Sequence, residues 1–272
     1  MMSYTETYFR VLEMGFWLSL FAAPLGCFLC FRRLSFAGDA LGHATLAGVS
    51  VAYLFFGASF VALSVGAVCA AFLATFFLYV CEKAFKLPSD IALTVSYSSM
   101  FAFGLFLLSQ RRLHLDHFLV GDIWGASAEA LWFMRIWGLI VLGLIAFCWR
   151  PLWLSVIDPK LARSLGHSRW IADSVLLVMV SISVVGMLQA VGMVLMASYL
   201  VFPAATSLPW ARSLSQMMMG AIISALVSSL IGVTVSIQYA GIGSGPLLAL
   251  SAAGLFLISH LTRWILRRNQ VS

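Results

Sequence analysis

Asp39 and His43 lie four positions apart in the segment FAGDALGHATLAGV (Phe36–Val49), which has no other charged residue. Four residues make about one helical turn, so in a helix both side chains project from the same face. A carboxylate in hydrocarbon costs roughly 2.5–3.5 kcal/mol on insertion scales and therefore normally faces a partner, a cavity or a transported ion. Because carboxylate oxygen and imidazole nitrogen are both ligands of divalent metals, the spacing predicts an intramembrane metal site at Asp39 and His43.

The composition indicates that membrane-spanning helices position this pair. Of the 272 residues, 62% are hydrophobic and only 10% are charged, whereas soluble domains have about 25% charged residues. No charged residue occurs between Arg212 and Arg263, an interval long enough for two membrane helices of about 20 residues each. We therefore expect an all-α polytopic membrane protein that forms one transmembrane domain over residues 1–272.

Basic residues at the ends of the apolar runs predict the topology. If the N-terminus is outside, nine spans place almost all of them on one side, and cytoplasmic loops are typically rich in Lys and Arg. Arg111 and Arg112 are exceptions on the outer side. The net charge of +6 thus belongs to the membrane surface and does not indicate nucleic-acid binding. The predicted spans are Met14–Phe31, Ala40–Phe56, Phe60–Val80, Ile91–Gln110, Ala130–Trp149, Ile171–Leu188, Val191–Leu208, Met217–Gln238 and Leu247–Ile265.

Two features of these spans stay open at the level of sequence. Gly192 and Pro203, with Gly186 and Gln189, interrupt the region 171–208, so it is either two short spans or one span with a re-entrant piece, which would give eight. Gly38 and Gly42 form a GxxxG pair around Asp39. Small residues at this spacing allow close helix approach in lipid, either within the chain or between two copies.

The loop IDPKLARSLGHSRW (Ile157–Trp170) predicts a short helix on the cytoplasmic side. Asp158 can cap its start, Pro159 suits its first position, and Gly166 can end it. Such a helix could dock a partner or lie at the membrane surface as an anchor. Asp173 follows, four residues after Arg169, and an ion pair between them is expected.

The segment HLDH contains His114, Asp116 and His117 on the predicted outer side. These three residues could receive a metal ion before it enters the membrane, although a solvated loop is the favoured interpretation.

Five blocks in order identify a family resemblance over nearly the full length: RRLSFAGDALGHATLAGV (32–49), LDHFLVGDIWGAS (115–127), DPKLARSLGHS (158–168), VGMVLMASYLVFPAATSLPWAR (191–212) and GSGPLLALSAAGLFLIS (243–259). Together they closely resemble the membrane permease subunits of bacterial zinc/manganese-type ABC importers. The TLAGV stretch without proline and the PAAT block followed by AR resemble the zinc permeases more, with manganese and iron as alternatives.

The resemblance implies a multi-pass protein of the bacterial inner membrane with about eight spans and no permanently bound cofactor. It implies a second permease copy or a paralogue, a cytoplasmic ABC ATPase and an extracytoplasmic metal-binding protein. Asp39 and His43 match the family's intramembrane metal site. The loop at about 158–168 matches the helix that couples the permease to the ATPase, with contact residues Asp158, Pro159, Leu161, Ala162, Leu165 and Gly166.

The residues themselves add two constraints to this resemblance. One chain offers two ligands, whereas zinc favours four, so a two-fold axis that joins two copies would complete a shell. The sequence has no G-x-x-x-x-G-K-[ST] phosphate loop, so ATP hydrolysis by that chemistry belongs to another polypeptide.

Two other classes are less consistent with the sequence. A proton-coupled secondary metal transporter could use the same Asp39–His43 pair but would not explain the 158–168 loop. For an intramembrane hydrolase, FAGD and LVGD lack the first glycine of GxGD, and no H-E-x-x-H occurs.

Overall fold

The computed structural model describes residues 4–57, 59–109, 124, 128–157, 159–165, 169–238 and 244–269, and the regular secondary structure in these ranges is entirely helical. Seven of the helices are long and apolar enough to cross a membrane, and two shorter apolar helices lie within α9. The predicted all-α polytopic class is therefore confirmed. The helices are α1 (Tyr4–Arg32), α2 (Ala37–Phe56), α3 (Phe60–Lys83), α4 (Ser89–Ser109), α6 (Ala128–Phe147), α7 (Trp149–Ile157), α8 (Pro159–Ser164), α9 (Arg169–Ser207), α10 (Leu214–Gln238) and α11 (Ser244–Arg268).

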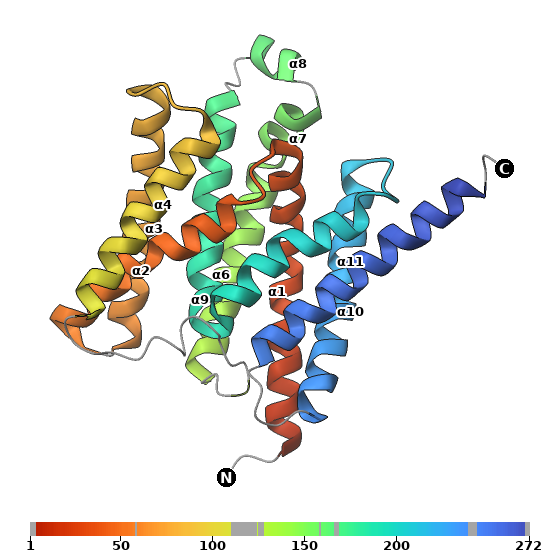
Figure 1. The fold of residues 1–272 in the computed structure, drawn as a ribbon, viewed down its shortest axis with the longest axis horizontal. Helices are drawn as coiled ribbons and strands as arrows, with labels where there is room; N and C mark the ends of the chain where they lie inside the picture. Colours follow the sequence, from red (N-terminus) through yellow and green to blue (C-terminus); the bar gives the residue numbers. More distant parts are fainter. Residues whose placement is uncertain are drawn as a thin grey trace.

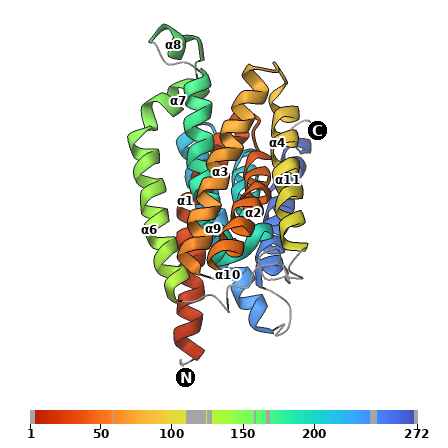
Figure 2. The same ribbon diagram turned by 90° about the vertical axis from the view of Figure 1, so that its left-hand side faces the viewer.

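The helices run up and down across one bundle (Figure 1). The N-terminus lies at one end of it, whereas α8 and the C-terminus lie toward the other, and the view at 90° agrees (Figure 2). The turn between α3 and α4, with Lys83 and Lys86, also lies at the α8 end. This is the distribution of positive charge expected for a cytoplasmic face.

Helix α9 reverses direction at Gly192. This residue has φ 77° and ψ 171°, a backbone conformation open to glycine but strained for other residues. Apolar helices Ile171–Met187 and Leu195–Ser207 flank it, and the second half of α9 turns back toward the end from which the first half came (Figure 1). The region 171–208 therefore forms two short apolar helices that run in opposite directions, and the count of nine spans stays a prediction.

The first helix is longer than the apolar span predicted within it, and a charge in its outer part is paired with α6. Glu13 accepts hydrogen bonds from Nε and Nη2 of Arg135 on α6, both at 2.6 Å. Trp17 Nε1 donates a third bond to Glu13 at 3.3 Å. The helix begins at Tyr4, ahead of the apolar span that the hydropathy pattern predicted from Met14, and this contact joins its outer part to α6.

Helix α1 ends where Arg33 adopts the left-handed conformation, with φ 57°. Leu34 N–H then donates to the carbonyl of Leu29 at 2.9 Å, a pattern that satisfies carbonyls at a helix C-terminus. The turn leads directly into α2 at Ala37. The end of α1 thereby sets where the Asp39–His43 helix starts.

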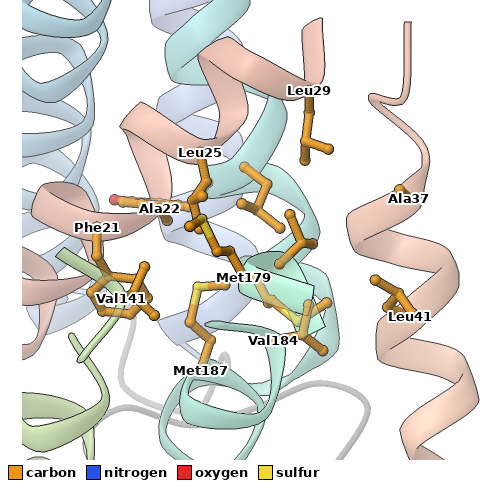
Figure 3. Packing of buried hydrophobic residues seen from close by; sticks show 14 of the residues in the cluster. Phe21, Ala22, Leu25, Leu29, Ala37, Leu41, Val141, Met179, Val184 and Met187 are labelled. Carbon is orange, nitrogen blue, oxygen red and sulfur yellow. The ribbon is translucent and has the colours of Figure 1, made fainter. Parts of the chain in front are cut away.

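The core forms where α1, α2, α6 and α9 meet (Figure 3). Phe21 and Leu25 of α1 lie among Val141, Met179 and Met187, all fully buried. Leu41 of α2 also points toward this cluster (Figure 3).

Close glycine contacts fix the position of α2. A Cβ on Gly38 would lie 2.5 Å from Leu200 Cδ1, and a Cβ on Gly42 would lie 2.5 Å from Met196 Cε. The GxxxG pair therefore packs against α9 of the same chain. On the next turns Gly48 meets Gly66 of α3 backbone to backbone, so a Cβ on either would collide with the other's carbonyl oxygen.

Candidate metal site

Helix α2 places Asp39 in its first turn and His43 one turn later, as the spacing predicted. The side chain of Asp39 is 33% exposed and that of His43 is 26% exposed. The neighbouring residues Ala40, Leu41 and Ala44 are buried. The pair thus lies on a side of α2 that is next to α4 and is only partly covered by it. In a membrane helix, a half-exposed carboxylate and imidazole are accessible to an ion or to a second protein.

The hydrogen bonding of His43 determines which of its ring nitrogens is available to bind a metal ion. Its Nδ1 lies 2.9 Å from the backbone carbonyl of Asp39 and 3.5 Å from Asp39 Oδ1. A carbonyl oxygen can only accept, so Nδ1 must be the atom that bears the proton. In the neutral ring the lone pair is then on Nε2, the arrangement found in metal-bound histidines whose other nitrogen is held by a carbonyl.

Aromatic rings of α4 hold the imidazole in place. The ring of Phe101 lies edge-on at 4.9 Å from that of His43, and the ring of Tyr97 at 6.1 Å. Further along, Ser50 Oγ donates to the carbonyl of Gly104 at 3.1 Å, so α2 and α4 stay in register. The histidine is consequently oriented by packing before any ion arrives.

The pair is chemically incomplete as a metal shell. In the described ranges, no group of three or more His, Cys, Asp or Glu side chains could hold an ion. Two protein ligands bind a divalent metal less strongly than the four of a structural zinc site. A complete shell needs ligands from water, from another subunit, or from both.

The second predicted site, the coupling element, forms a small projection at the end of the bundle opposite the N-terminus (Figures 1 and 2). Helix α8 begins at Pro159, as predicted, because proline suits the first helical position. Leu161 and Leu165 are 46% and 61% exposed, whereas Ala162 is buried. Asp158 and Gly166 lie outside the described residues, as do His114, Asp116 and His117 of the predicted outer entry.

An ion pair lies at the end of α1, close to the start of α2. Asp173 pairs with Arg32 at 2.8 Å, a partner that the sequence did not suggest, and the predicted pair with Arg169 stays a prediction because the Arg169 side chain lies outside what the structure describes. Arg32 is almost fully buried and also donates from Nη2 to Ser155 Oγ of α7 at 3.3 Å. The local i,i+4 spacing could not reveal Arg32 as a partner, because tertiary packing brings α1, α7 and α9 together at this point.

Arg32 and the Glu13–Arg135 pair were not recognised from the sequence as interacting residues. Arg32 resembled one more basic residue of a cytoplasmic loop. Glu13 and Arg135 both lie at the edges of apolar runs on the N-terminal side of the bundle. This shared position is the sequence feature from which their pairing could have been predicted.

Comparison with known proteins agrees with this architecture. The family model of the ABC 3 transport family matches residues 4–263. The chain is 32% identical over 253 residues to a probable iron transport system membrane protein of Haemophilus influenzae, covering 89% of this chain and 88% of that protein. It is 31% identical over 255 residues to the manganese import system permease protein ScaB of Streptococcus parasanguinis, covering 93% and 89% respectively.

Two solved structures have a similar fold. PsaBC from Streptococcus pneumoniae in complex with Fab has a TM-score of 0.80 at 27% identity, over 92% of this chain and 89% of that one. An inward-facing putative metal-chelate type ABC transporter has a TM-score of 0.71 at 17% identity, over 92% and 85%, and this likeness concerns the fold alone. The chain is a multi-pass permease subunit of the bacterial cytoplasmic membrane and is distinct from the transporter's ATPase. Because the family model matches from the first helix to the last, the chain belongs to the ABC 3 transport family.

Proposed function

We propose that this permease imports a divalent transition metal and that Asp39 and His43 are the ligands that hold the ion within the membrane. The observation on which the proposal rests is the geometry of α2, where a carboxylate and an imidazole with a defined tautomer share one half-exposed face. The named manganese and iron transport relatives support a metal cargo. The ion is a substrate in this proposal, so weak and exchangeable ligation is required.

A second permease copy would complete the site. If α2 of two copies met across a two-fold axis, two aspartates and two histidines would surround one ion. The partly exposed position of the pair fits this arrangement, because both side chains remain accessible beside α4. We favour a homodimer, with a paralogue as the alternative partner, and in either case residues 1–272 act as one permease domain.

The α7–α8 projection is the proposed contact with the ATPase. Leu161 and Leu165 present two apolar side chains one turn apart on α8, which suits docking into a groove of another protein. Asp158, Pro159, Ala162 and Gly166 would shape the ends and the inner face of this element. From α7, Ser155 contacts Arg32, so movement of the ATPase has a direct physical route to the end of α1 and the start of α2.

On the opposite side, the proposed partner is an extracytoplasmic metal-binding protein. His114, Asp116 and His117 are the residues that we propose for receiving the ion from it, on the basis of their ligand types.

The sequence blocks and the named relatives favour different metals as the cargo. The TLAGV and PAAT blocks predict zinc, whereas the named relatives are manganese and iron proteins. Oxygen and nitrogen ligands bind Zn²⁺, Mn²⁺ and Fe²⁺ alike. Zinc preference therefore stays a prediction, and competition of Zn²⁺ with Mn²⁺ in the assay below tests it.

The test is uptake of radiolabelled metal into vesicles that contain the permease with its cognate ATPase and binding protein. Asp39→Asn and His43→Ala should each abolish ATP-dependent uptake while the protein is inserted normally. His260→Ala is a matched control, because Nδ1 of His260 also contacts the carbonyl four residues earlier, at 3.1 Å, but that residue is Phe256 rather than an aspartate. Normal uptake by both Asp39 and His43 variants would refute the site assignment.

A further inference from the structure

A cleft lies far along the chain from the metal pair, between the end of α9, the following turn, the start of α10, and α11. Its volume is about 580 Å³, and Trp210, Arg212, Gln216 and Ser259 contribute to its lining. The α9–α10 turn lies at the same end of the bundle as the C-terminus and α8 (Figure 1). By the distribution of basic residues, this is the cytoplasmic face.

Hydrogen bonds give the walls of this cleft a fixed shape. Trp210 Nε1 donates to Ser259 Oγ at 2.8 Å, and Ser259 Oγ donates to the carbonyl of Thr206 at 2.7 Å. Gln216 Oε1 accepts the backbone N–H of Arg212 at 3.0 Å, so its amide nitrogen remains a donor. The indole is thereby locked between α9 and α11.

Two arginines lie at this cleft, with Arg212 in its lining and Arg263 beside Trp210. Arg263, one turn beyond Ser259, has its guanidinium carbon 5.3 Å above the Trp210 ring. Its Nε is shielded from solvent and has no hydrogen-bond partner among the residues that the structure describes. The sequence has no Asp or Glu after Asp173, so α10, α11 and the second half of α9 supply no carboxylate. A buried donor of this kind normally has an acceptor, and here none is provided by these helices.

We propose that the cleft binds the phosphate of an anionic phospholipid from the cytoplasmic leaflet. Phosphate oxygens accept several hydrogen bonds, and arginine is the side chain best suited to donate them. Basic pockets between membrane helices on this side are suited to lipid headgroups. Leu257, Leu261 and Trp264 of α11 are exposed nearby and offer an apolar surface to the acyl chains. The proposal is independent of the metal pair and of the transported ion.

The experiment measures retention of phosphatidylglycerol by the detergent-purified full-length protein, using native mass spectrometry. The protein is first reconstituted in phosphatidylcholine vesicles with roughly one quarter phosphatidylglycerol. Arg212→Gln and Arg263→Gln should each weaken retention about fivefold, the effect of one basic residue near a membrane surface. Arg268→Gln is the control, because this residue lies more than a turn further along α11 and stacks on Trp264 instead. Arg212 is exposed, so its substitution tests the proposal even if Arg263→Gln does not fold.

Two further measurements distinguish binding of a phospholipid from binding of free inorganic phosphate. Arg212→Lys keeps the charge and should retain most of the lipid. Inorganic phosphate added in excess should not displace phosphatidylglycerol, since the acyl chains contribute to binding. Equal retention by wild type and both Gln variants, equal loss in Arg268→Gln, or displacement by inorganic phosphate would each overturn the assignment of a lipid site.

Discussion

Replacing Gly48 by alanine tests how closely the metal-binding helix packs. In addition to the backbone collision with Gly66, the new Cβ would lie 2.6 Å from the Cβ of Ala70, which is about 1 Å inside ordinary van der Waals contact. Neither helix backbone can rotate away, so α2 and α3 must separate. Overpacking of this kind typically costs about 1–3 kcal/mol.

Gly143→Ala is the matched control, because a Cβ at this helical position would meet no atom within 4 Å. Both substitutions gain the helix propensity of alanine over glycine, about 1 kcal/mol, so their difference isolates the packing cost. We expect Gly48→Ala to unfold about 2–12 °C below Gly143→Ala when the purified proteins are heated in detergent at one scan rate. Equal midpoints for the two variants would refute the direct backbone contact between α2 and α3.

Three other contacts predict measurable effects. Arg32→Gln removes the guanidinium that lies 2.8 Å from Asp173, which should cost up to about 3–5 kcal/mol for a largely buried pair and should uncouple ATP hydrolysis from transport in reconstituted vesicles; stability and coupling both equal to wild type would contradict this role. Glu13→Gln weakens the bidentate contact with Arg135. It should lower the free energy of unfolding by only about 1 kcal/mol, since both side chains are partly exposed. A loss as large as that of Arg32→Gln would show that the pair is more buried than the structure indicates. Tyr199→Phe removes the hydroxyl that contacts Ser228 at 3.1 Å and Ser229 at 2.8 Å in the core, so a loss of about 1–3 kcal/mol is expected in thermal unfolding, and no change would mean that the network contributes nothing.

The sequence predicted the helices well because they depend on local pattern, whereas the metal site at Asp39 and His43 stays a prediction. Apolar runs require helices in lipid, where every backbone group must be bonded within the segment. The four-residue spacing required Asp39 and His43 to share a face. Pro159 was correctly placed at the start of α8 for the same reason, since its preference for the first turn is intrinsic.

What the sequence could not predict depends on which helices become neighbours. Arg32, the partner of Asp173 that the structure shows, is distant in the chain. Glu13 of α1 pairs with Arg135 of α6, a contact that the hydropathy pattern of either helix could not indicate. The GxxxG pair contacts α9 because that helix reverses at Gly192, and the sequence marked the interruption without giving its direction.

The most direct test of the central claim is electron paramagnetic resonance of Mn²⁺ bound to the purified permease. The proposed site predicts about one ion per two chains, with hyperfine coupling to an imidazole nitrogen that disappears in His43→Ala and persists in His260→Ala. Asp39→Asn should weaken binding of the same ion. Unchanged nitrogen coupling and affinity in the His43 and Asp39 variants would contradict the account.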